Sequence, residues 1–498
     1  MNPVKYVITS KTNLQFKYGK GVSAIEKLLA KLEKEDSKKG LDTRTLFIDD
    51  ASSAAKAGVK PVKAVTQKEC KRIVDELYKK HTPVYMVLLG AQDVVPFQEI
   101  MNPAPDDDSV VPTDLPYACD APYSRFIDNF VGPTRVVGRI PDIPGRADIA
   151  YLQVLLETSM AQKPVKTEAY EKYFSVSAWV WKRSTEQSLL NMFGHNGKLM
   201  LSPPEDEKYT KAQLKPLTHF YNCHGAPKDA AYYGQKGEKY PVAMKAALLD
   251  KKISPGTIAA AECCYGAELT DPLFFDAPQL SIANTYLGNK ALAFLGSSTI
   301  AYGPPDGQGL ADLITQYFIK EILCGASTGR ALLEARQQFL TNSGPQLDPY
   351  ELKTLAQFYL LGDPSVQPVL SESDVQKGTL AKSSIANNRM RLFSKGIGLK
   401  RITTGAKKVI NEVKSSDEKK LAQVLKELNF TGAEERVYEV KPKTIGLSGM
   451  EKMLMGEKAR YRTFVKQGPG KQQICDLRVL VVKENEDQLL GWRMYVSK

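Results

Sequence analysis

Two short segments of the chain each combine a reactive side chain with a nearby glycine. Leu217–Gly225 (LTHFYNCHG) ends in a His-Gly pair, and Thr257–Gly266 (TIAAAECCYG) ends in Cys-Cys-Tyr-Gly. A cysteine thiolate can attack a carbonyl carbon, and an imidazole can protonate the leaving amine. The two segments therefore predict Cys263 as a nucleophile and His224 as its general acid and base.

The glycine that follows the histidine has an expected role of its own. Gly225 lets a substrate carbonyl approach the main chain closely, so its N–H and that of Cys263 could form an oxyanion hole. Adjacent side chains of a strand face opposite sides, so only one of Cys263 and Cys264 can face the site. A Cys-x-x-Gly spacing selects Cys263, and a Cys-x-Gly spacing would select Cys264. We expect Cys263 to be the nucleophile and keep Cys264 as the alternative.

The two segments must lie side by side for this chemistry. Their His224 and Cys263 are 39 residues apart, which leaves room for a loop, a helix near Val242–Asp250 and the next strand. A crossover of this length makes the two strands parallel neighbours. Because parallel strands end at the same edge of a sheet, where α/β folds keep their sites, the two side chains should meet there.

Strand and helix patterns alternate over the first 370 residues, which predicts an α/β fold with a mainly parallel sheet. Val84–Gly90 (VYMVLLG) is apolar on both faces, as expected of a strand buried in such a sheet. We divide this part into an N-terminal α/β sub-domain, residues 1–165, and a catalytic sub-domain, residues 166–370. Other predicted elements are Lys5–Ser10, Val22–Leu32, Thr45–Ile48, Gln67–Lys80, Phe130–Ile140, Ala147–Met160, Tyr173–Trp181, Thr185–Phe193, Ala291–Leu295, Leu310–Leu323, Gly329–Phe339 and Phe358–Leu361.

The basic charge of the chain is concentrated after residue 370. The whole chain has a net charge of +12, and residues 371–498 hold 26 Lys and Arg against 15 Asp and Glu. Residues 371–408 are rich in Ser, Lys and Gly, which predicts a basic linker. Residues 409–498 predict a basic accessory domain of α+β or β class. Its aromatic residues are too sparse to favour nucleic acid, so we expect it to dock an activating or inhibitory protein partner, or the linker to be processed.

The remaining composition excludes several classes of protein. The 498 residues are enough for more than one domain, and no apolar run approaches the roughly 20 residues of a membrane span. The amino terminus lacks the apolar core of a secretion signal, and seven cysteines without framework spacing indicate reduced thiols. We therefore expect a cytoplasmic protein without a membrane segment. No dinucleotide or P-loop fingerprint indicates a cofactor.

Five further sequence blocks, together with the His-Gly and Cys-x-x-Gly segments, carry a family resemblance. In their order they resemble the gingipain-type catalytic domain of the caspase/legumain/gingipain group of cysteine peptidases, over about residues 80–370. The resemblance implies a caspase-like three-layer fold, with Cys263 as nucleophile, His224 as general acid and base, and Gly225 with Cys263 at the oxyanion hole. The blocks are LLGAQDVVP (88–96), PTDLPYACD (112–120), VGRIPD (137–142), ALAFLGSST (291–299) and LLGDPS (360–365).

The resemblance also implies where a substrate side chain would bind. Tyr302, in the loop after ALAFLGSST, corresponds to an aromatic wall of the S1 pocket, which holds the residue before the scissile bond (P1). Asp306 falls near the end of that pocket, and Glu186 lies roughly where a gingipain has its S1 acid. A carboxylate there favours a basic P1 residue, with Arg above Lys because Arg pairs bidentately. The acid that supports the gingipain histidine is replaced near Trp179.

Other interpretations of these residues are less favoured. Adjacent Cys-His and Cys-Cys pairs lack the spacing of zinc ligands, so we expect no metal. Asp106–Asp108 could bind calcium, although a solvated acidic loop is the simpler interpretation. The chain is thus predicted to be an intracellular cysteine endopeptidase, acting on protein or peptide substrates and restrained as a zymogen by a partner or by processing. A catalytically silent relative that serves as a scaffold or binding protein is the alternative.

Overall fold

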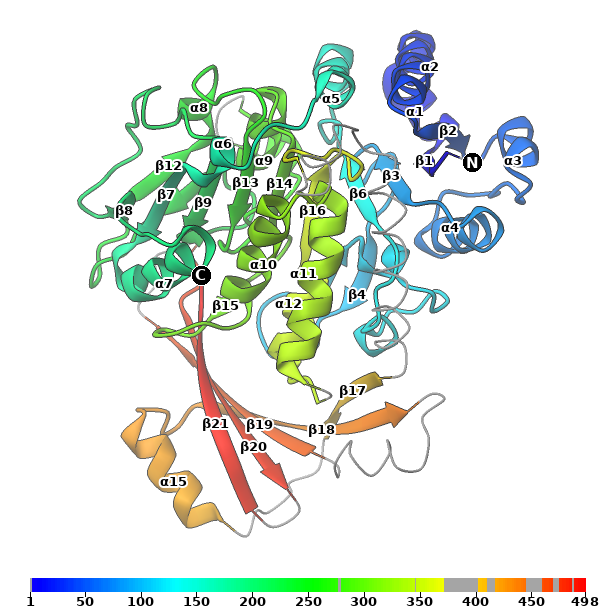
Figure 1. Ribbon diagram of the computed structural model, residues 1–498. Helices are drawn as coiled ribbons and strands as arrows, with labels where there is room; N and C mark the ends of the chain where they lie inside the picture. The colour runs from blue at the N-terminus through cyan, green and yellow to red at the C-terminus, as the bar shows by residue number, and fades with distance from the viewer. Residues whose placement is uncertain are drawn as a thin grey trace.

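Within the described residues, ten strands between Val4 and Gly362 form one sheet (Figure 1). The computed structural model describes residues 2–275, 279–344, 346–370, 402–409, 417–444, 459–468, 474–485 and 488–498. In order across the sheet, the strands are β2 (Asp42–Phe47), β1 (Val4–Thr9), β3 (Tyr85–Leu89), β6 (Val137–Ile140), β16 (Phe358–Gly362), β14 (Ala293–Ser297), β13 (Ile258–Ala261), β9 (Thr218–Asn222), β7 (Tyr173–Ala178) and β8 (Leu199–Ser202). Neighbouring strands run parallel except β14 and β16, which are antiparallel. The predicted fold class, an α/β fold with a mainly parallel sheet, is therefore confirmed.

Helices cover both faces of this sheet. Along β13, Ala259 and Ala261 belong to one buried apolar cluster, whereas Ile258 and Ala260 belong to a second cluster on the opposite face. The first cluster includes residues of α2 (Val22–Lys38), α4 (Gln67–His81), α5 (Ile149–Ala161) and α9 (Ile282–Gly288). The second includes residues of α7 (Lys182–Phe193), α10 (Ala311–Leu323), α11 (Thr328–Ser343) and α12 (Pro349–Gln357). The site strands are thus held between two helical layers.

Shorter elements complete this part of the chain. No helix within the described residues is long and apolar enough to cross a membrane. The short elements are α1 (Lys11–Tyr18), α3 (Ala51–Ala57), α6 (Glu168–Glu171), the paired strands β4 (Gln98–Met101) and β5 (Val110–Thr113), and the 3-10 helices η1 (Gly19–Gly21), η2 (Leu115–Ala118), η3 (Ile127–Asn129), η4 (Trp179–Trp181) and η5 (Pro272–Phe274).

The strands that precede His224 and Cys263 are parallel neighbours, as their spacing predicts. The β9 residue Tyr221 is opposite Ala261 of β13. The connection between them differs from the prediction, because Val242–Lys245 forms the strand β12 and only Ala246–Leu249 forms a helix, α8. β12 pairs with β11 (Ala231–Tyr233), which pairs with β10 (His224–Gly225). Pairing with a neighbouring strand has overridden the local helical pattern there. The expected strand Phe130–Ile140 is similarly reduced to β6.

A second, antiparallel sheet is formed mainly by the C-terminal region. Its strand order is β15 (Tyr302–Gly303), β21 (Gln488–Ser497), β20 (Leu477–Asn485), β19 (Ala459–Gln467), β18 (Glu434–Thr444) and β17 (Ile402–Val409), and α15 (Glu418–Glu427) packs on it through Leu421. Residues 371–401 of the predicted linker lie outside the described residues, while most of β17 falls within its last part. Only β15 comes from the α/β part, and through it the end of β21 (red in Figure 1) joins that part.

Candidate active site

The predicted catalytic residues lie at one edge of the main sheet. His224 lies two residues after the end of β9 and begins β10, and the two cysteines follow β13 after Glu262. All three side chains are buried. Gly225 packs directly on the cysteine segment, where an added Cβ would come within 1.8 Å of the Cys264 carbonyl oxygen. Glycine at this position therefore allows the His-Gly segment and the Cys-Cys segment to approach each other closely.

The two cysteines face opposite sides of the sheet. Cys263 belongs to the buried cluster of Ala259 and Ala261, whereas Cys264 belongs to the cluster on the other face. By the same alternation, Glu262 lies on the Cys264 side. The Cys264 thiol contacts the main chain of Ala301, accepting from its N–H at 3.3 Å and donating to its carbonyl at 3.5 Å. Burial raises the pKa of both thiols, so neither is a thiolate in this structure.

The end of the C-terminal sheet lies directly against this edge. Ser497 pairs with Tyr302 in antiparallel register, and the Lys498 N–H donates to the Ala301 carbonyl at 2.9 Å. The carbonyl oxygen of Lys498 accepts a hydrogen bond from the Cys264 N–H at 2.8 Å. The extended end of the chain therefore pairs with β15 beside the cysteines, and the Lys498 carbonyl accepts a hydrogen bond from the Cys264 N–H.

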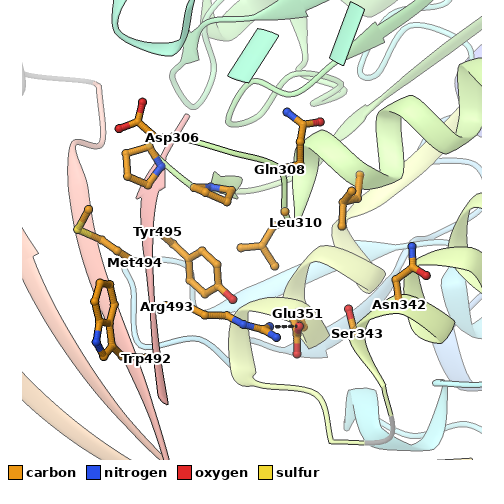
Figure 2. Close-up of a pocket in the computed structure, with 14 residues that line it drawn as sticks. Asp306, Gln308, Leu310, Asn342, Ser343, Glu351, Trp492, Arg493, Met494 and Tyr495 are labelled. Carbon is orange, nitrogen blue, oxygen red and sulfur yellow. Dashed lines mark hydrogen bonds and ion pairs between the residues drawn. The ribbon is translucent and has the colours of Figure 1, made fainter. Parts of the chain in front are cut away.

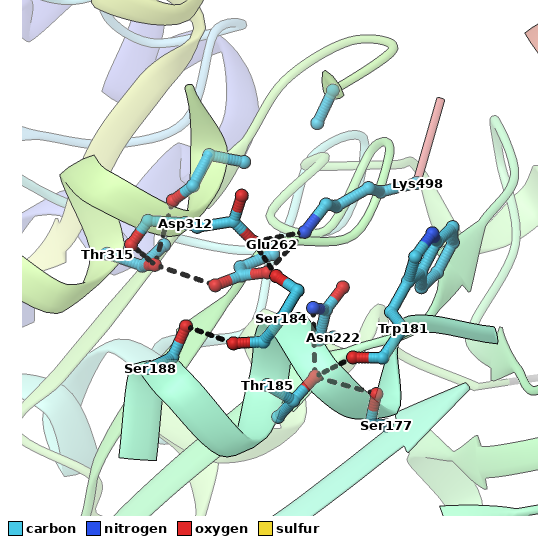
Figure 3. A network of polar contacts seen from close by, with 12 residues as sticks. Ser177, Trp181, Ser184, Thr185, Ser188, Asn222, Glu262, Asp312, Thr315 and Lys498 are labelled. Carbon is cyan, nitrogen blue, oxygen red and sulfur yellow. Dashed lines mark hydrogen bonds and ion pairs between the residues drawn. The ribbon is translucent and has the colours of Figure 1, made fainter. Parts of the chain in front are cut away.

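The side chain of Lys498 enters a buried acidic pocket (Figure 3). Its ammonium donates to Glu262 at 2.7 Å and to Asp312 of α10. The carboxylates have further donors: the Ser184 hydroxyl to Asp312 at 2.8 Å, and the Thr315 hydroxyl to Glu262 at 3.2 Å. All three charged side chains are fully buried. A basic side chain in this pocket is thus paired and hydrogen-bonded, as a buried charge must be.

The charges of this pocket depend on one another. Burial alone would lower the pKa of Lys498, but the carboxylates of Asp312 and Glu262 outweigh it and raise that pKa. Burial and the neighbouring Asp312 charge raise the pKa of Glu262 well above its usual range. The pocket therefore disfavours two free carboxylates and favours a bound cation.

A glycine provides the space for the lysine side chain. An added Cβ at Gly303 would lie 2.2 Å from Lys498 Cε and 2.9 Å from an Asp312 oxygen. The Trp181 ring lies on another side of the lysine. Its centroid is 5.6 Å from the Lys498 side-chain nitrogen and 4.4 Å from the centroid of the His224 ring. The indole thus lies between the acidic pocket and the predicted general base.

A chain of hydrogen bonds orients His224. Its Nε2 contacts the Gln235 side-chain oxygen at 2.7 Å, and the Gln235 amide donates to the Tyr240 hydroxyl, also at 2.7 Å. Tyr240 in turn donates to Asp476 of the C-terminal region at 3.0 Å. The Gln235 oxygen fixes the proton on Nε2 and leaves Nδ1 as the basic nitrogen. In the described part of the chain, the buried Nδ1 has no hydrogen-bond partner, and burial lowers the pKa of His224 to about 4.

The S1 residues expected from the resemblance are not brought together around the cysteines. The ring of Tyr302 is buried against Tyr350, and its hydroxyl donates to Asp106 at 2.8 Å. Glu186 is partly exposed and lies 3.8 Å from Lys182 one helical turn away. The Asp306 side chain is 73% exposed and lies 4.0 Å from Arg183.

Asp306 lines a different cavity, of about 540 Å³, between the α/β part and β21 (Figure 2). Its carboxylate points away from the other lining residues. Neither cysteine nor His224 lines this cavity, whose walls include Leu310, Trp492 and Tyr495.

The acidic loop Asp106–Asp108 is a structural element. Lys353 pairs with Asp106 and Asp108 at 2.6 Å each, and the Ile300 N–H donates to Asp108 at 2.9 Å. These buried contacts replace the expected solvated loop and hold the segment that leads to Ala301. No cluster of three or more His, Cys, Asp or Glu side chains in the described residues could hold a metal ion.

Sequence reasoning missed most of the acidic pocket. Glu262 could have been found, because strand alternation places it on the Cys264 face, two residues away. Asp312 could also have been predicted as a site residue, because it is a lone acid near the start of a predicted apolar helix. Nothing in the sequence pattern brings Lys498 or Asp476 to the site, because both arrive through the folding of the C-terminal region.

An α/β fold with a histidine and cysteines at the carboxyl edge of neighbouring parallel strands fits a cysteine peptidase. Residues 215–369 match the family model described as Peptidase family C25. This match covers both site strands and confirms the resemblance to gingipain-type cysteine peptidases for that segment. For these residues, the match supports the chemistry of a cysteine peptidase.

Comparisons with curated proteins and with solved structures add no further family assignment. No curated protein matches the chain. A solved structure described as "Structure of Protease" is similar over 100% of this chain and 97% of its own chain, with 13% sequence identity and a TM-score of 0.48.

Proposed function

We propose that the chain is a cysteine endopeptidase that cleaves after a basic residue, with Cys264 as nucleophile and His224 as general acid and base. The observation that carries the proposal is the placement of Lys498. Its carbonyl lies on the Cys264 N–H, while its side chain lies between Glu262 and Asp312. This is the placement that a P1 residue needs for attack at its carbonyl carbon.

The choice of Cys264 rests on this main-chain contact. The resemblance implies that the N–H of the nucleophilic cysteine points at the substrate carbonyl, and the N–H in that position belongs to Cys264. Its side chain also lies on the face of the acidic pocket, whereas Cys263 packs in the opposite core. Cys263, which the Cys-x-x-Gly spacing favours, stays a prediction that substitution of each cysteine will decide. Gly225 stays the predicted second oxyanion donor.

The His224 imidazole has the protonation needed for its role. With the Nε2 proton held by Gln235, the free Nδ1 can take the thiol proton and later give it to the leaving amine. Its low pKa keeps it neutral at physiological pH while the pocket is filled. Water that reaches this edge once the segment leaves would reduce the burial that shifts the histidine and thiol pKa values.

The acidic pocket supports Lys at P1. Glu262 and Asp312 each offer one oxygen to a compact ammonium, and Gly303 lies against the lysine stem. This reverses the order of Arg above Lys expected from the sequence. Tyr302, Asp306 and Glu186 stay a competing prediction for S1, and their variants belong in the same experiment.

The test is a fluorogenic peptide series that differs only at P1, measured with the Lys498→Glu variant, in which the chain's own lysine no longer fills the pocket. Lys should be cleaved best, and Glu262→Gln and Asp312→Asn should each remove that preference. Asp306→Asn and Glu186→Gln should leave it unchanged. An intracellular location and activation by a partner or by processing also stay predictions, which cell fractionation and co-purification would test; the linker arginines and lysines considered for processing lie outside the described residues.

A further inference from the structure

The strand that fills the acidic pocket belongs to the protein itself. Residues 496–498 combine main-chain pairing with β15, a carbonyl on the Cys264 N–H and a lysine in the acidic pocket. Each contact alone is common in folded proteins. Together they are the contacts of an extended peptide bound by strand addition, with one pocket that reads a side chain.

We propose that residues 496–498 are a tethered peptide ligand of the acidic pocket and of the Cys264 N–H, which excludes peptide substrates until the end of β21 detaches. This inference rests on the proposed peptidase site, and it identifies the segment that occupies that site. Lys498 is fully buried, so a substrate lysine cannot reach Glu262 and Asp312 while it is present. Lys498 and a substrate lysine therefore cannot occupy the pocket at the same time.

The attachment of the strand makes its local concentration high. Arg493 pairs with Glu351 at 2.7 Å, and the Tyr495 hydroxyl donates to Asp348 at 3.0 Å, both at the start of α12. Tyr461 of β19 donates to the Gln346 carbonyl at 2.9 Å. These contacts lie outside the acidic pocket and hold the strand close to it. A tethered ligand of this kind competes at an effective concentration near millimolar or above.

The same region also contacts the predicted general base. Asp476 ends the hydrogen-bond chain that orients His224, so the C-terminal sheet acts on the site at two points. Release of residues 496–498 would empty the pocket and also remove the hydrogen bonds of the Ser497 hydroxyl with the main chain of Cys475 and Leu477, which flank Asp476. The opening of the pocket and the orientation of His224 are therefore coupled through this segment.

The first experiment measures binding without any cleavage. A fluorescein-labelled peptide Trp-Arg-Met-Tyr-Val-Ser-Lys, which has the sequence of residues 492–498, ends at lysine and offers no bond after it to cut. Its affinity would be measured by fluorescence anisotropy for the full chain, Lys498→Ala and Lys498→Glu. The charge reversal places a third carboxylate beside the acidic pair and should expel the strand end.

The matched control is Lys466→Ala on β19, whose ammonium donates, among the described residues, to the exposed Asn429. We expect Lys498→Glu to bind the peptide at least tenfold more tightly than the full chain, with Lys498→Ala between them and Lys466→Ala unchanged. Equal affinity for all four proteins, with unchanged circular dichroism, would overturn the inference.

The second experiment leaves the pocket unaltered. Six residues are appended after Lys498, and the intact mass is followed. If the strand lies as a substrate does, the Cys264 sulfur bonds to the Lys498 carbonyl carbon, the peptide C–N bond breaks, and His224 gives the thiol proton to the leaving nitrogen. Water then hydrolyses the thioester and restores the thiol.

We expect the appended residues to be lost after Lys498, and to be retained in the Cys264→Ala and Lys498→Gln forms. An intact extension on a protein that cleaves Lys peptides would overturn the tethered ligand and leave the proposed function standing. Tighter peptide binding by Lys498→Glu, without hydrolysis by any form, would support the ligand and overturn the proposed function.

Discussion

The main-chain N–H of Cys264 donates a hydrogen bond to the carbonyl oxygen of Lys498 at 2.8 Å. The donor follows a central strand of the α/β sheet, and the acceptor follows the strand β21 of the C-terminal sheet. The contact defines the direction of the bound segment, because the adjacent Lys498 N–H donates to Ala301. It also places the lysine side chain beside Glu262, two residues before the cysteine.

The acidic pocket should determine the P1 preference. In the Lys498→Glu background, where the pocket is open, Glu262→Gln should lower kcat/KM for a Lys substrate about 100-fold, because a buried ammonium loses one of its two carboxylates. Peptides with a neutral P1 residue should change little. The measurement is kcat/KM over the P1 series, with Glu186→Gln as the control on a partly exposed carboxylate outside the acidic pocket. An equal loss for all P1 residues would indicate a general structural effect.

The close approach of Gly303 predicts a steric effect on the same pocket. Gly303→Ala would place a methyl group 2.2 Å from the Lys498 side chain, which must then shift or leave. We expect this variant to weaken binding of Lys at P1 and to loosen the end of β21. Hydrogen exchange at Ser497 and Lys498 would report the loosening. Gly491→Ala, which has open space around its Cβ position, is the control, and equal exchange in both variants would contradict the account.

The buried histidines predict how stability depends on pH. Burial lowers the pKa of His219 and His224 to about 4, while an unfolded histidine titrates near 6.5. At these two groups the unfolded state therefore binds more protons between these values, so their contribution to stability is full above about pH 6.5 and falls as the pH decreases toward 4. Each histidine contributes up to about 3 kcal/mol by this linkage.

Urea unfolding at pH 7, 6 and 5 measures this loss. His219→Gln should make the unfolding free energy decrease less between pH 7 and 5, because one of the two histidines that bind protons more tightly in the unfolded state is gone. His219 donates or accepts only within the core, with Tyr286 and Pro216, and is not part of the proposed site. An unchanged decrease in the variant would mean that other groups dominate this pH range.

Removal of the C-terminal region should show how far the two parts depend on each other. The sequence predicts that residues 1–370 fold alone. In the structure, truncation there would leave Glu262 and Asp312 without their lysine and would remove the contact of Asp476 with Tyr240. We expect a folded but less stable core, measured by thermal unfolding, that binds Lys-containing peptides more readily than the full chain. An aggregated core would place the domain boundary elsewhere.

The sequence predicted the parts of the site that depend on local pattern. Apolar strands before His224 and Cys263 required these residues to lie at the ends of neighbouring parallel strands, and they do. The face of each cysteine depends on the exact end of the strand, which spacing to a glycine alone does not determine. The side chains that form the acidic pocket come from three separate segments, and only the folded chain brings Asp312 and Lys498 to Glu262. The resemblance placed S1 on Tyr302 and Asp306, but tertiary packing turns the first into the core and leaves the second exposed.

The most direct measurement is hydrolysis of one fluorogenic Lys peptide by Lys498→Glu and by the same chain with either cysteine replaced. The account predicts cleavage by Lys498→Glu, full loss with Cys264→Ala, and retained cleavage with Cys263→Ala. A chloromethyl ketone of the same peptide should label Cys264 only. Retained cleavage with Cys264→Ala and loss of cleavage with Cys263→Ala would contradict the assignment of Cys264 as the nucleophile. The reaction would then take place on the opposite face of the sheet, where Cys263 lies.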